Sequence, residues 1–398
     1  MVSILLGSLL AWGSPASWGS QPPEACMPVE GEFLSVETAH SVAAADLNED
    51  GHLDVAVVAH YPRRYTEAGA VFLGDGRGQF RFLAHLAIGD HNHGVVLTDL
   101  NHDGHLDLVT STADAQGRET VFDVVHTFLG DGTGRFPQHA TWPAKYFRLG
   151  PLDVQVGDLN HDGHPDLIAA GSGTGHVAVL LGDGTGQFSR RKYYANIPTR
   201  TRSTALADFN GDGHLDVIAA NRYGRSVSLF LGDGTGQLKF QRDFATGFGP
   251  RSVIAADFNQ DGRTDVAVTC REPDQVAVLL NVGAGGFAQA KTYAVGDDPR
   301  SIVTADFNGD GWLDLAVTNT KSQTVSLWFG DGRGQFSGRQ DIRVGDGPIG
   351  GNDPPGEGEG NGLVGLAAAD VNEDGRPDLL VTSSFDDHVY VLINRCSP

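Results

Sequence analysis

Basic residues, sulfur-containing residues and long apolar runs are all scarce in this chain. Lys and Arg number 28 against 50 Asp and Glu, so the formal charge is −22. A chain of this charge repels nucleic acid and anionic membranes. The 2 Met residues, beside abundant Gly, Asp and Val, argue against a helical bundle. No apolar run is long enough to span a bilayer, and no nucleophile elbow, phosphate-binding loop or zinc signature appears.

Glycine and apolar residues are what the chain has in quantity. Apolar residues make up 40% of its 398 residues, enough for a sizeable core, which excludes wholesale disorder. Glycine contributes 54 residues, about twice the ordinary share, without the period of collagen. The length fits two or three domains or one large repeat architecture. The composition favours many short strands joined by tight turns.

The N-terminus resembles a secretory signal peptide. Residues 4–12 are apolar and small residues follow, with Ser14-x-Ala16 and Ser17-x-Gly19 as candidate cleavage sites. The segment before the apolar run has no Lys or Arg, so a start further upstream and a simple apolar terminus remain alternatives. We predict a signal peptide at 1–19 and a mature domain at 20–398, located outside the cell, in a periplasm or on the cell surface.

One motif, Asp-x-Asn-x-Asp-Gly-x-x-Asp, recurs seven times. Short apolar segments precede and follow each copy, as at 252–257 and 265–270. A third segment ends in a Gly-Asp-Gly-x-Gly-x-Phe turn, as at 182–188, whose glycines permit the positive φ of a tight hairpin. Every fixed position of the motif is intact in each copy, at 46–54, 99–107, 158–166, 208–216, 257–265, 306–314 and 370–378.

Four antiparallel strands in each of seven repeats predict an all-β, seven-bladed propeller. The last repeat has three expected strands, and an N-terminal strand at 33–37 is expected to complete this blade and close the ring. The loops and strand pattern resemble the FG-GAP/VCBS repeat proteins, relatives of integrin α-subunit propellers and fungal seven-bladed lectins. The resemblance covers 40–394 and implies a calcium-binding propeller that recognises a ligand, without indicating which ligand.

The cysteines fit this closure. Counted from the first Asp of each loop, Cys26 falls where Phe188 begins a fourth strand, and Cys396 falls at the hairpin position of Gly184. A Cys26–Cys396 disulfide would replace the missing turn and is chemically allowed in an exported protein. The alternative is two unpaired cysteines in the tails. Cys270 ends an apolar strand and is expected to be a buried free thiol.

The seven motif copies are candidate sites for structural Ca²⁺. Positions 1, 3, 5 and 9 offer side-chain oxygens, position 7 offers its backbone carbonyl, and Gly at position 6 permits the turn. Hard oxygen ligands favour Ca²⁺ over Zn²⁺ and Mg²⁺. The loop resembles the start of an EF-hand but lacks Glu at position 12; the alternative is a metal-free Asx turn. Seven Ca²⁺ ions would bring the formal charge from −22 to −8.

The predicted calcium ligands comprise five residues from each loop, with the position-7 residue acting through its carbonyl. They are Asp46, Asn48, Asp50, His52, Asp54, Asp99, Asn101, Asp103, His105, Asp107, Asp158, Asn160, Asp162, His164, Asp166, Asp208, Asn210, Asp212, His214, Asp216, Asp257, Asn259, Asp261, Arg263, Asp265, Asp306, Asn308, Asp310, Trp312, Asp314, Asp370, Asn372, Asp374, Arg376 and Asp378.

The face opposite these loops is the candidate ligand face. The residue six positions before each loop begins the innermost strand and should surround the channel mouth. Five of these seven residues are Arg or His, namely His40, His93, Arg202, Arg251 and Arg300. We predict that they hold an anionic ligand, such as a uronate or a sulfated sugar, through Arg forks. The alternative is that each Arg ties neighbouring blades together.

Other residues of interest map near the same face. Arg200, Arg222, Arg271 and the aromatic residues Tyr61, Tyr65, Trp142, Tyr146, Tyr223 and Phe248 would suit sugar stacking or simple loop packing. His91-Asn-His93 with Asp90 is a weak transition-metal candidate. The linker at 345–362 is expected to be a solvated loop, as are the loop histidines at 52, 102, 105, 161, 164 and 214.

Two functions remain open. The first is a non-enzymatic binding or adhesion module, lectin-like, for a carbohydrate or protein partner. The second is a polysaccharide lyase, whose candidate groups are His40, His93, Tyr61 and the arginines. We expect a monomer with no nucleic-acid partner.

Overall fold

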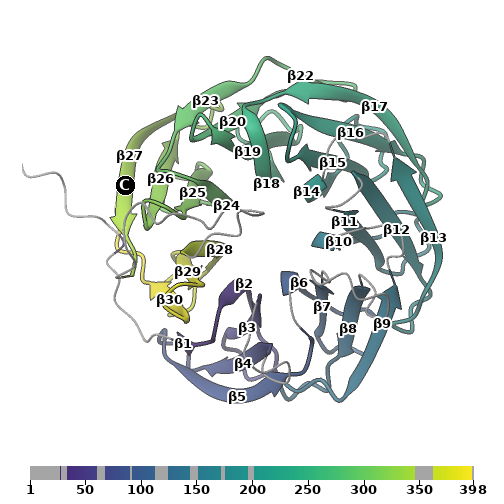
Figure 1. Cartoon of the computed structure of the whole chain (residues 1–398), viewed down its shortest axis with the longest axis vertical. Coiled ribbons are helices and arrows are strands. Elements are labelled where there is room, and N and C mark those ends of the chain that lie inside the picture. Colours follow the sequence, from purple (N-terminus) through teal and green to yellow (C-terminus); the bar gives the residue numbers. More distant parts are fainter. Residues whose placement is uncertain are drawn as a thin grey trace, which may run out of the picture.

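Seven four-stranded antiparallel sheets surround a central axis, as predicted (Figure 1). The computed structural model describes residues 27, 34–60, 68–89, 92–112, 124–143, 151–171, 175–195, 201–345 and 362–396. No helix occurs in these residues, and accordingly none that could cross a membrane. The architecture is a seven-bladed β-propeller.

The blades follow one another around the ring in chain order. Each runs from an inner to an outer strand: blade one is β2 (Ala39–Ala45), β3 (Asp54–Ala59), β4 (Gly69–Gly74) and β5 (Phe80–Leu86); blade two is β6 (Asn92–Thr98), β7 (Asp107–Thr112), β8 (Val124–Leu129) and β9 (Gln138–Pro143); blade three is β10 (Pro151–Gly157), β11 (Asp166–Gly171), β12 (His176–Gly182) and β13 (Phe188–Ala195); blade four is β14 (Thr201–Ala207), β15 (Asp216–Asn221), β16 (Ser226–Gly232) and β17 (Leu238–Ala245); blade five is β18 (Phe248–Ala256), β19 (Asp265–Glu272), β20 (Gln275–Leu279) and β23 (Lys291–Ala294), with a small ribbon of β21 (Asn281–Gly283) and β22 (Gly286–Phe287); blade six is β24 (Pro299–Ala305), β25 (Asp314–Asn319), β26 (Thr324–Gly330) and β27 (Phe336–Arg343); blade seven is β28 (Leu363–Ala369), β29 (Asp378–Ser383), β30 (His388–Leu392) and β1 (Leu34–Ser35).

The second strand of each blade is the most deeply buried. Every residue of β3, β11 and β29 is buried. Both faces of such a strand pack against a neighbouring blade, so its sequence is an unbroken apolar run rather than an alternating one. Seven separate hydrophobic clusters result, one at each boundary between blades. The core is therefore a ring of interfaces between blades.

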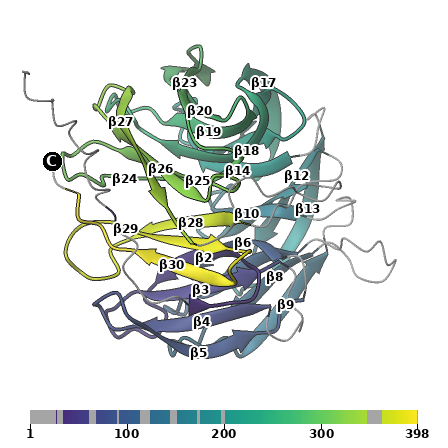
Figure 2. The same cartoon turned by 60° about the vertical axis from the view of Figure 1, so that its left-hand side comes forward.

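The ring closes through the N-terminal strand, as predicted. β1 pairs antiparallel with β30, with Leu34 opposite Val389. Leu34 and Val389 then join residues of β3 in the cluster between blades seven and one. β28 and β29 lie beside β2 and β3 in the ring (Figures 1 and 2). Strand exchange between the two ends of the chain thus removes the open edge of blade seven.

The hairpin glycines join each blade to the one before it. The last glycine of the turn donates its N–H to the second residue of the preceding calcium-type loop: Gly134 to the Leu47 carbonyl at 2.9 Å and Gly236 to the Leu159 carbonyl at 3.1 Å. Gly236 has φ of 75°, and an added Cβ would lie 2.7 Å from the Leu181 side chain. Only glycine satisfies both the backbone conformation and the close approach.

Blades five and seven replace the first turn glycine by asparagine in the same way. Asn281 Nδ2 donates to the Phe209 carbonyl at 2.9 Å, and Asn394 Nδ2 donates to the Phe307 carbonyl at 2.8 Å. The amide oxygen of each then accepts an N–H two residues on, from Gly283 and from Cys396, at 2.8 Å. Cys396 therefore stands at the start of a hairpin turn, where the sequence register places it.

Candidate functional site

Each acidic loop is a tight turn held by its own carboxylates. In the first copy, Asp46 accepts N–H groups from Asp50 and Gly51, at 3.2 and 2.9 Å. Asn48 Oδ1 accepts the Asp50 N–H at 3.0 Å, and Asp50 Oδ1 accepts the His52 N–H at 2.9 Å. The side chains at positions 1, 3 and 5 thus turn inward toward the loop backbone. The other copies make closely similar bonds.

The Asp at position 9 has a different environment, because it begins the buried second strand. Asp107 Oδ2 accepts the Leu100 N–H at 2.8 Å, and its Oδ1 accepts the Gly130 N–H at 2.8 Å. It thereby fastens the loop to the third strand. Burial raises the pKa of Asp107 to about 6, and the same happens to the position-9 carboxyls of loops three to seven. A cation beside such a buried carboxylate would favour its ionised form.

The donor set of the loops fits Ca²⁺. As they stand, no three His, Cys, Asp or Glu side chains in the described part of the chain are arranged to hold an ion. The oxygens at positions 1, 3 and 5 nevertheless gather within one turn, and each carboxylate oxygen keeps a lone pair beyond those that accept N–H groups. Oxygen-only donors in this number suit a hard cation of calcium size. The assignment of the loop residues as calcium ligands stays a prediction.

The structure brings the five predicted rim residues into one pocket at the channel mouth. This pocket encloses about 120 Å³. Small residues separate the charged ones, with Ser41, Ser203, Ser252 and Ser301 one position after four of them. Val364 of blade seven also contributes, and the charged residues that line it are His40, His93, Asp153, Arg202, Arg251 and Arg300.

A β-bulge places each rim residue at the mouth. Pairing of the first and second strands shifts register at the same point in all seven blades, between Ala39 and Ser41 in blade one and between Pro250 and Val253 in blade five. A bulge leaves a residue outside the ladder and redirects its side chain. Threonine hydroxyls of the preceding blade fix the rim backbone: Thr269 donates to the Arg300 carbonyl at 2.9 Å, and Thr382 to the His40 carbonyl at 2.9 Å.

The three rim arginines are not equivalent. Arg251 and Arg300 are 2% and 4% exposed, whereas Arg202 is half-buried. Arg251 Nη2 lies 3.1 Å from Asp298 Oδ1, and Arg271 Nε lies 3.3 Å from the same oxygen. Although burial opposes it, the positive charge of Arg251, Arg300 and Arg271 lowers the pKa of Asp298. For Arg251, the alternative that it ties neighbouring blades is therefore supported.

The histidine side of the pocket is a cluster of three rings. The ring centroids of His40, His60 and His93 lie 4.5 to 5.1 Å apart, and all three residues are buried. His40 Nδ1 lies 3.3 Å from the His93 carbonyl oxygen. His60 was not among the predicted rim residues, because it comes from the end of β3. Asp90 and His91, the other members of the weak metal candidate, lie outside the described residues.

Two acidic residues of this region were missed from the sequence. Asp153 lines the pocket and accepts the N–H and the hydroxyl of Thr204, at 2.7 and 3.1 Å, and burial raises its pKa to about 6. It stands where the other blades carry Ser or Gly, and this single departure from the pattern could have identified it. Asp298 has φ of 59°, at a position where blade five has Gly249. An acid at a glycine-type position was the available signal.

The other residues noted on this face have mixed placements. Tyr223 is 47% exposed, with the Arg222 guanidinium 5.5 Å from its ring. Arg225 lies over Phe248 at 5.4 Å. Trp142 packs against Phe188, so it belongs to the packing between blades two and three. Tyr61, Tyr65, Tyr146, Arg200 and the linker at 346–361 lie outside the described residues.

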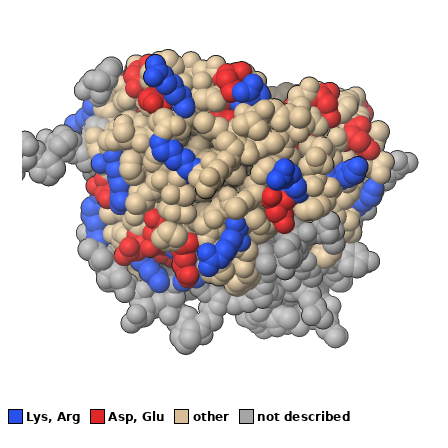
Figure 3. Space-filling view, turned by 90° about the horizontal axis from the view of Figure 1, so that it is seen from above, with Lys and Arg blue, Asp and Glu red and all other residues tan. Residues whose placement is uncertain are grey.

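Charge on the outside of the ring is mixed. In the view onto its edge, acidic and basic side chains lie interspersed and no extended patch of one sign is seen (Figure 3). Three carboxylates in each of seven loops account for 21 of the 50 acidic residues. The acidic excess is therefore largely gathered in the loops, away from the cationic channel mouth.

These features define a seven-bladed β-propeller with an acidic loop on every blade. The model of the FG-GAP-like repeat matches residues 46–110, 158–219, 208–268, 257–317 and 306–381. The chain belongs to the FG-GAP-like repeat family.

Relatives of known sequence include two integrin α chains of Drosophila melanogaster. Integrin alpha-PS3 is 26% identical over 158 residues, and integrin alpha-PS5 is 25% identical over 171 residues. These matches cover 37% and 40% of this chain, but only 14% and 17% of the two integrins.

Similar solved structures come from bacteria and a fungus. A protein of unknown function from Desulfotomaculum acetoxidans DSM 771 has a TM-score of 0.56 and 14% identity, covering 77% of this chain and 90% of its own. A protein from Lactobacillus plantarum has a TM-score of 0.57 and 15% identity, covering 86% and 96%. An Agrocybe aegerita lectin that recognises non-reducing terminal N-acetylglucosamine has a TM-score of 0.47 and 20% identity, covering 77% and 81%. The two bacterial likenesses show the fold alone.

Proposed function

We propose that this protein is an exported, calcium-stabilised binding module whose channel mouth holds an anionic group of a carbohydrate ligand. The observation that carries the proposal is the pocket itself. Five residues that are cationic or can become so line one pocket of a protein with a formal charge of −22. Such a local reversal of charge concentrates anions and fixes their orientation.

The charges in the mouth favour an anion even after the internal ion pairs are considered. Asp298 faces Arg251 and Arg271 and lowers the positive charge at one side of the pocket. Asp153 is the single acid among the residues that line it. Arg202 and Arg300, with the histidines opposite, leave an excess of donors. Guanidinium groups bind carboxylate and sulfate through paired hydrogen bonds.

Pocket size and polarity favour a saccharide. A volume of about 120 Å³ is small beside the several hundred Å³ typical of pockets that enclose a whole ligand. It fits one charged substituent, while the rest of the ligand extends over the loops of this face. The hydroxyls of Ser41, Ser203, Ser252 and Ser301 add donors and acceptors suited to sugar hydroxyls.

Calcium would act as a structural ion on the opposite face. Each loop directs oxygens into one turn, and each is fastened by its position-9 carboxylate to the third strand of the same blade. A bound ion would neutralise the repulsion between the three carboxylates of a loop. It would thereby stabilise the hairpin contacts that join neighbouring blades.

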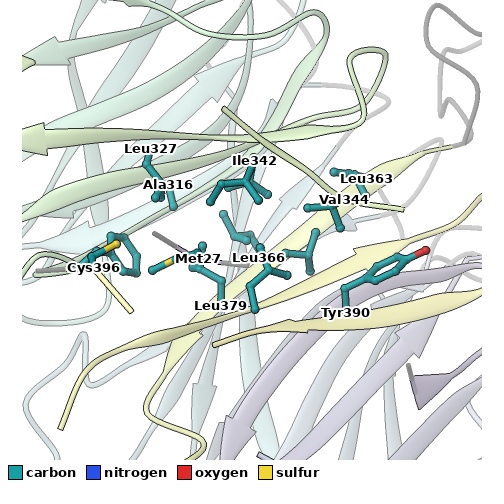
Figure 4. Packing of buried hydrophobic residues seen from close by; sticks show 14 residues of the cluster. Met27, Ala316, Leu327, Ile342, Val344, Leu363, Leu366, Leu379, Tyr390 and Cys396 are labelled. Carbon is teal, nitrogen blue, oxygen red and sulfur yellow. The ribbon is translucent and has the colours of Figure 1, made fainter. Parts of the chain in front are cut away.

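A disulfide between the chain ends would suit an exported protein. Cys270 is buried and free, as predicted, and burial raises the pKa of its thiol to about 11. Cys26 lies outside the described residues. Its neighbour Met27 packs in the same buried cluster as Cys396 (Figure 4). This proximity supports the pairing of Cys26 with Cys396.

A lyase remains the second candidate, because His40 and His93 share the pocket with Arg202 and Arg300. A base near an Arg-bound carboxylate is the arrangement that proton abstraction beside a uronate carboxylate requires. Tyr61 lies outside the described residues and adds no support.

The test is binding of the purified protein to anionic and neutral polysaccharides in the presence of Ca²⁺. We expect polygalacturonate or a sulfated glycan to bind and dextran not to bind, with affinity falling as salt rises. Arg202→Ala should weaken binding, while Arg339→Ala on the outer strand β27 serves as the control. Formation of unsaturated uronate product would assign the lyase function instead. Equal affinity for neutral and anionic glycans would contradict the proposal.

A further inference from the structure

Position 4 of the acidic loops has a backbone conformation that suits glycine. Loops four and six carry glycine there, Gly211 and Gly309, with φ of 80° and 75°. The other five loops hold a residue with a side chain at positive φ, which is unfavourable for L-residues. These residues are Glu49 (61°), His102 (61°), His161 (58°), Gln260 (55°) and Glu373 (58°). A strained residue kept where glycine would fit indicates that its side chain has a task.

All five of these side chains reach the acidic loop of the next blade. Gln260 Nε2 donates to the Gly311 carbonyl at 3.2 Å. The other four contact the position-7 histidine of the next loop: Glu49 contacts His105, Glu373 contacts His52, His102 contacts His164, and His161 contacts His214. The loop histidines were expected to be merely solvated. They instead form a belt of contacts between blades.

Two of these contacts join imidazoles to each other. His102 Nε2 lies 3.1 Å from His164 Nδ1, and His161 Nε2 lies 2.8 Å from His214 Nδ1. The position-7 rings are half-buried against hairpin glycines: a Cβ added to Gly184 would lie 2.4 Å from His164 Nδ1. The rings at position 4 are exposed. Each pair therefore combines one ring fixed by the hairpin with one that can adjust.

We propose that these two histidine pairs bind divalent transition-metal ions, one between blades two and three and one between blades three and four. Imidazole nitrogen suits Zn²⁺, Ni²⁺ and Cu²⁺ and is a poor ligand for Ca²⁺. With metal–nitrogen bonds of 2.0–2.1 Å, two adjacent ligands lie roughly 2.9–3.4 Å apart. The observed separations of 2.8 and 3.1 Å need only small rotations of the exposed rings to reach this range.

Proton accounting is simple for a neutral pair. One ring donates its N–H to the bare nitrogen of the other when no metal is bound. When an ion enters, the donor ring carries its proton on its other nitrogen, and both facing nitrogens present lone pairs to the metal. No third His, Cys, Asp or Glu among the described residues completes either site. Water fills the remaining positions.

The sites are separable from the calcium loops that carry them. The loop oxygens at positions 1, 3 and 5 turn inward, whereas the histidine rings point across the boundary between blades. Position 7 would offer Ca²⁺ its backbone carbonyl, which leaves the ring available. A transition metal would thus clamp blades two, three and four together while the loops keep their own ion.

The experiment is titration of the full chain with NiCl₂ or CuCl₂ in excess Ca²⁺, so that hard-cation sites are saturated. We expect two nitrogen-ligated ions per chain beyond those bound by the double variant His102→Gly and His161→Gly. Glycine is the residue that loops four and six carry at this position, so the fold should be retained. Gln260→Gly is the matched control: it changes the same position but removes no imidazole.

The outcomes are distinct. Loss of about one ion with each single variant and a tenfold or greater fall in affinity at the altered boundary support the proposal. Electron paramagnetic resonance of the Cu²⁺ form should show two nitrogen ligands that disappear in the double variant. Equal stoichiometry and equal nitrogen signals in the wild-type protein and the double variant would overturn it. Loss of an ion in Gln260→Gly would also contradict it.

Discussion

The two faces of this propeller use the same repeat in opposite ways. On the loop face, seven copies of one motif make closely similar hydrogen bonds, and the differences are confined to positions 4 and 7. On the channel face, the residue at one register position is His, Arg, Leu or Val according to the blade. Uniform residues hold the blades together, and residues that vary around the ring form the pocket. Stability and recognition should therefore respond to different mutations.

Removal of calcium should have the largest effect. We expect EDTA to lower the melting temperature by well over about 10 °C, because the carboxylates of each loop then repel one another and ion binding no longer favours the native state. Re-addition of Ca²⁺ should restore it, as followed by circular dichroism. An unchanged melting curve in chelator would show that the loops are metal-free turns.

Breaking the clasp should come next. A disulfide that closes a ring of about 370 residues contributes at most roughly 6 kcal/mol in the chain-entropy model. Peptide mapping without reductant should recover a Cys26–Cys396 peptide, and Cys270 should be alkylated only after unfolding. Cys396→Ser should then lower the urea midpoint. Recovery of Cys270 in a disulfide would refute the closure.

Arg251 should behave as part of the scaffold although it lies on the channel face. Arg251→Ala leaves the buried Asp298 with less compensating charge, which should cost about 3 kcal/mol of unfolding free energy. Adding Asp298→Asn should recover part of that loss. Urea denaturation of both variants measures it. If Arg251→Ala unfolds at the wild-type midpoint, the ion pair has no structural role.

Asp153 should make stability depend on pH. Its pKa is about 6 in the folded protein against 3.8 ordinarily, so the folded state binds the proton more tightly than the unfolded state. Its contribution is unchanged below about pH 4 and becomes unfavourable as pH rises through 6. Asp153→Asn should thus be more stable than the wild type by about 1–3 kcal/mol at pH 7.5, with the gap closing near pH 4.5. Urea midpoints at both pH values, at constant Ca²⁺, measure it; a gap that does not depend on pH would contradict the assignment.

Much of this fold could be predicted from the sequence because its signals repeat. The loop motif, the apolar second strands and the glycine hairpins each recur around the ring, so the number of blades and their register follow from spacing. The same register located His40, His93, Arg202, Arg251 and Arg300 at one mouth. It also located Cys396 at a hairpin turn and the N-terminal strand in blade seven.

The parts that could not be predicted depend on contacts between blades. The bulge that directs each rim residue into the mouth leaves no mark in the spacing. The pairing of Arg251 with Asp298 joins residues from different blades, so periodicity does not identify it. The His102–His164 contact needs both the left-handed backbone and the geometry of adjacent loops. Such pairs become visible only when neighbouring repeats are placed side by side.

Separation of the two faces is tested most directly by Arg202→Ala. Arg202 lines the mouth but is only half-buried, so its loss should leave the calcium-dependent melting temperature within about 2 °C of the wild-type value. Affinity for an anionic polysaccharide should fall by about 1–3 kcal/mol, because a charged hydrogen bond to the ligand is lost. Both quantities are measured on the same preparation. A protein that melts much earlier yet binds the polysaccharide as well as wild type would contradict the account.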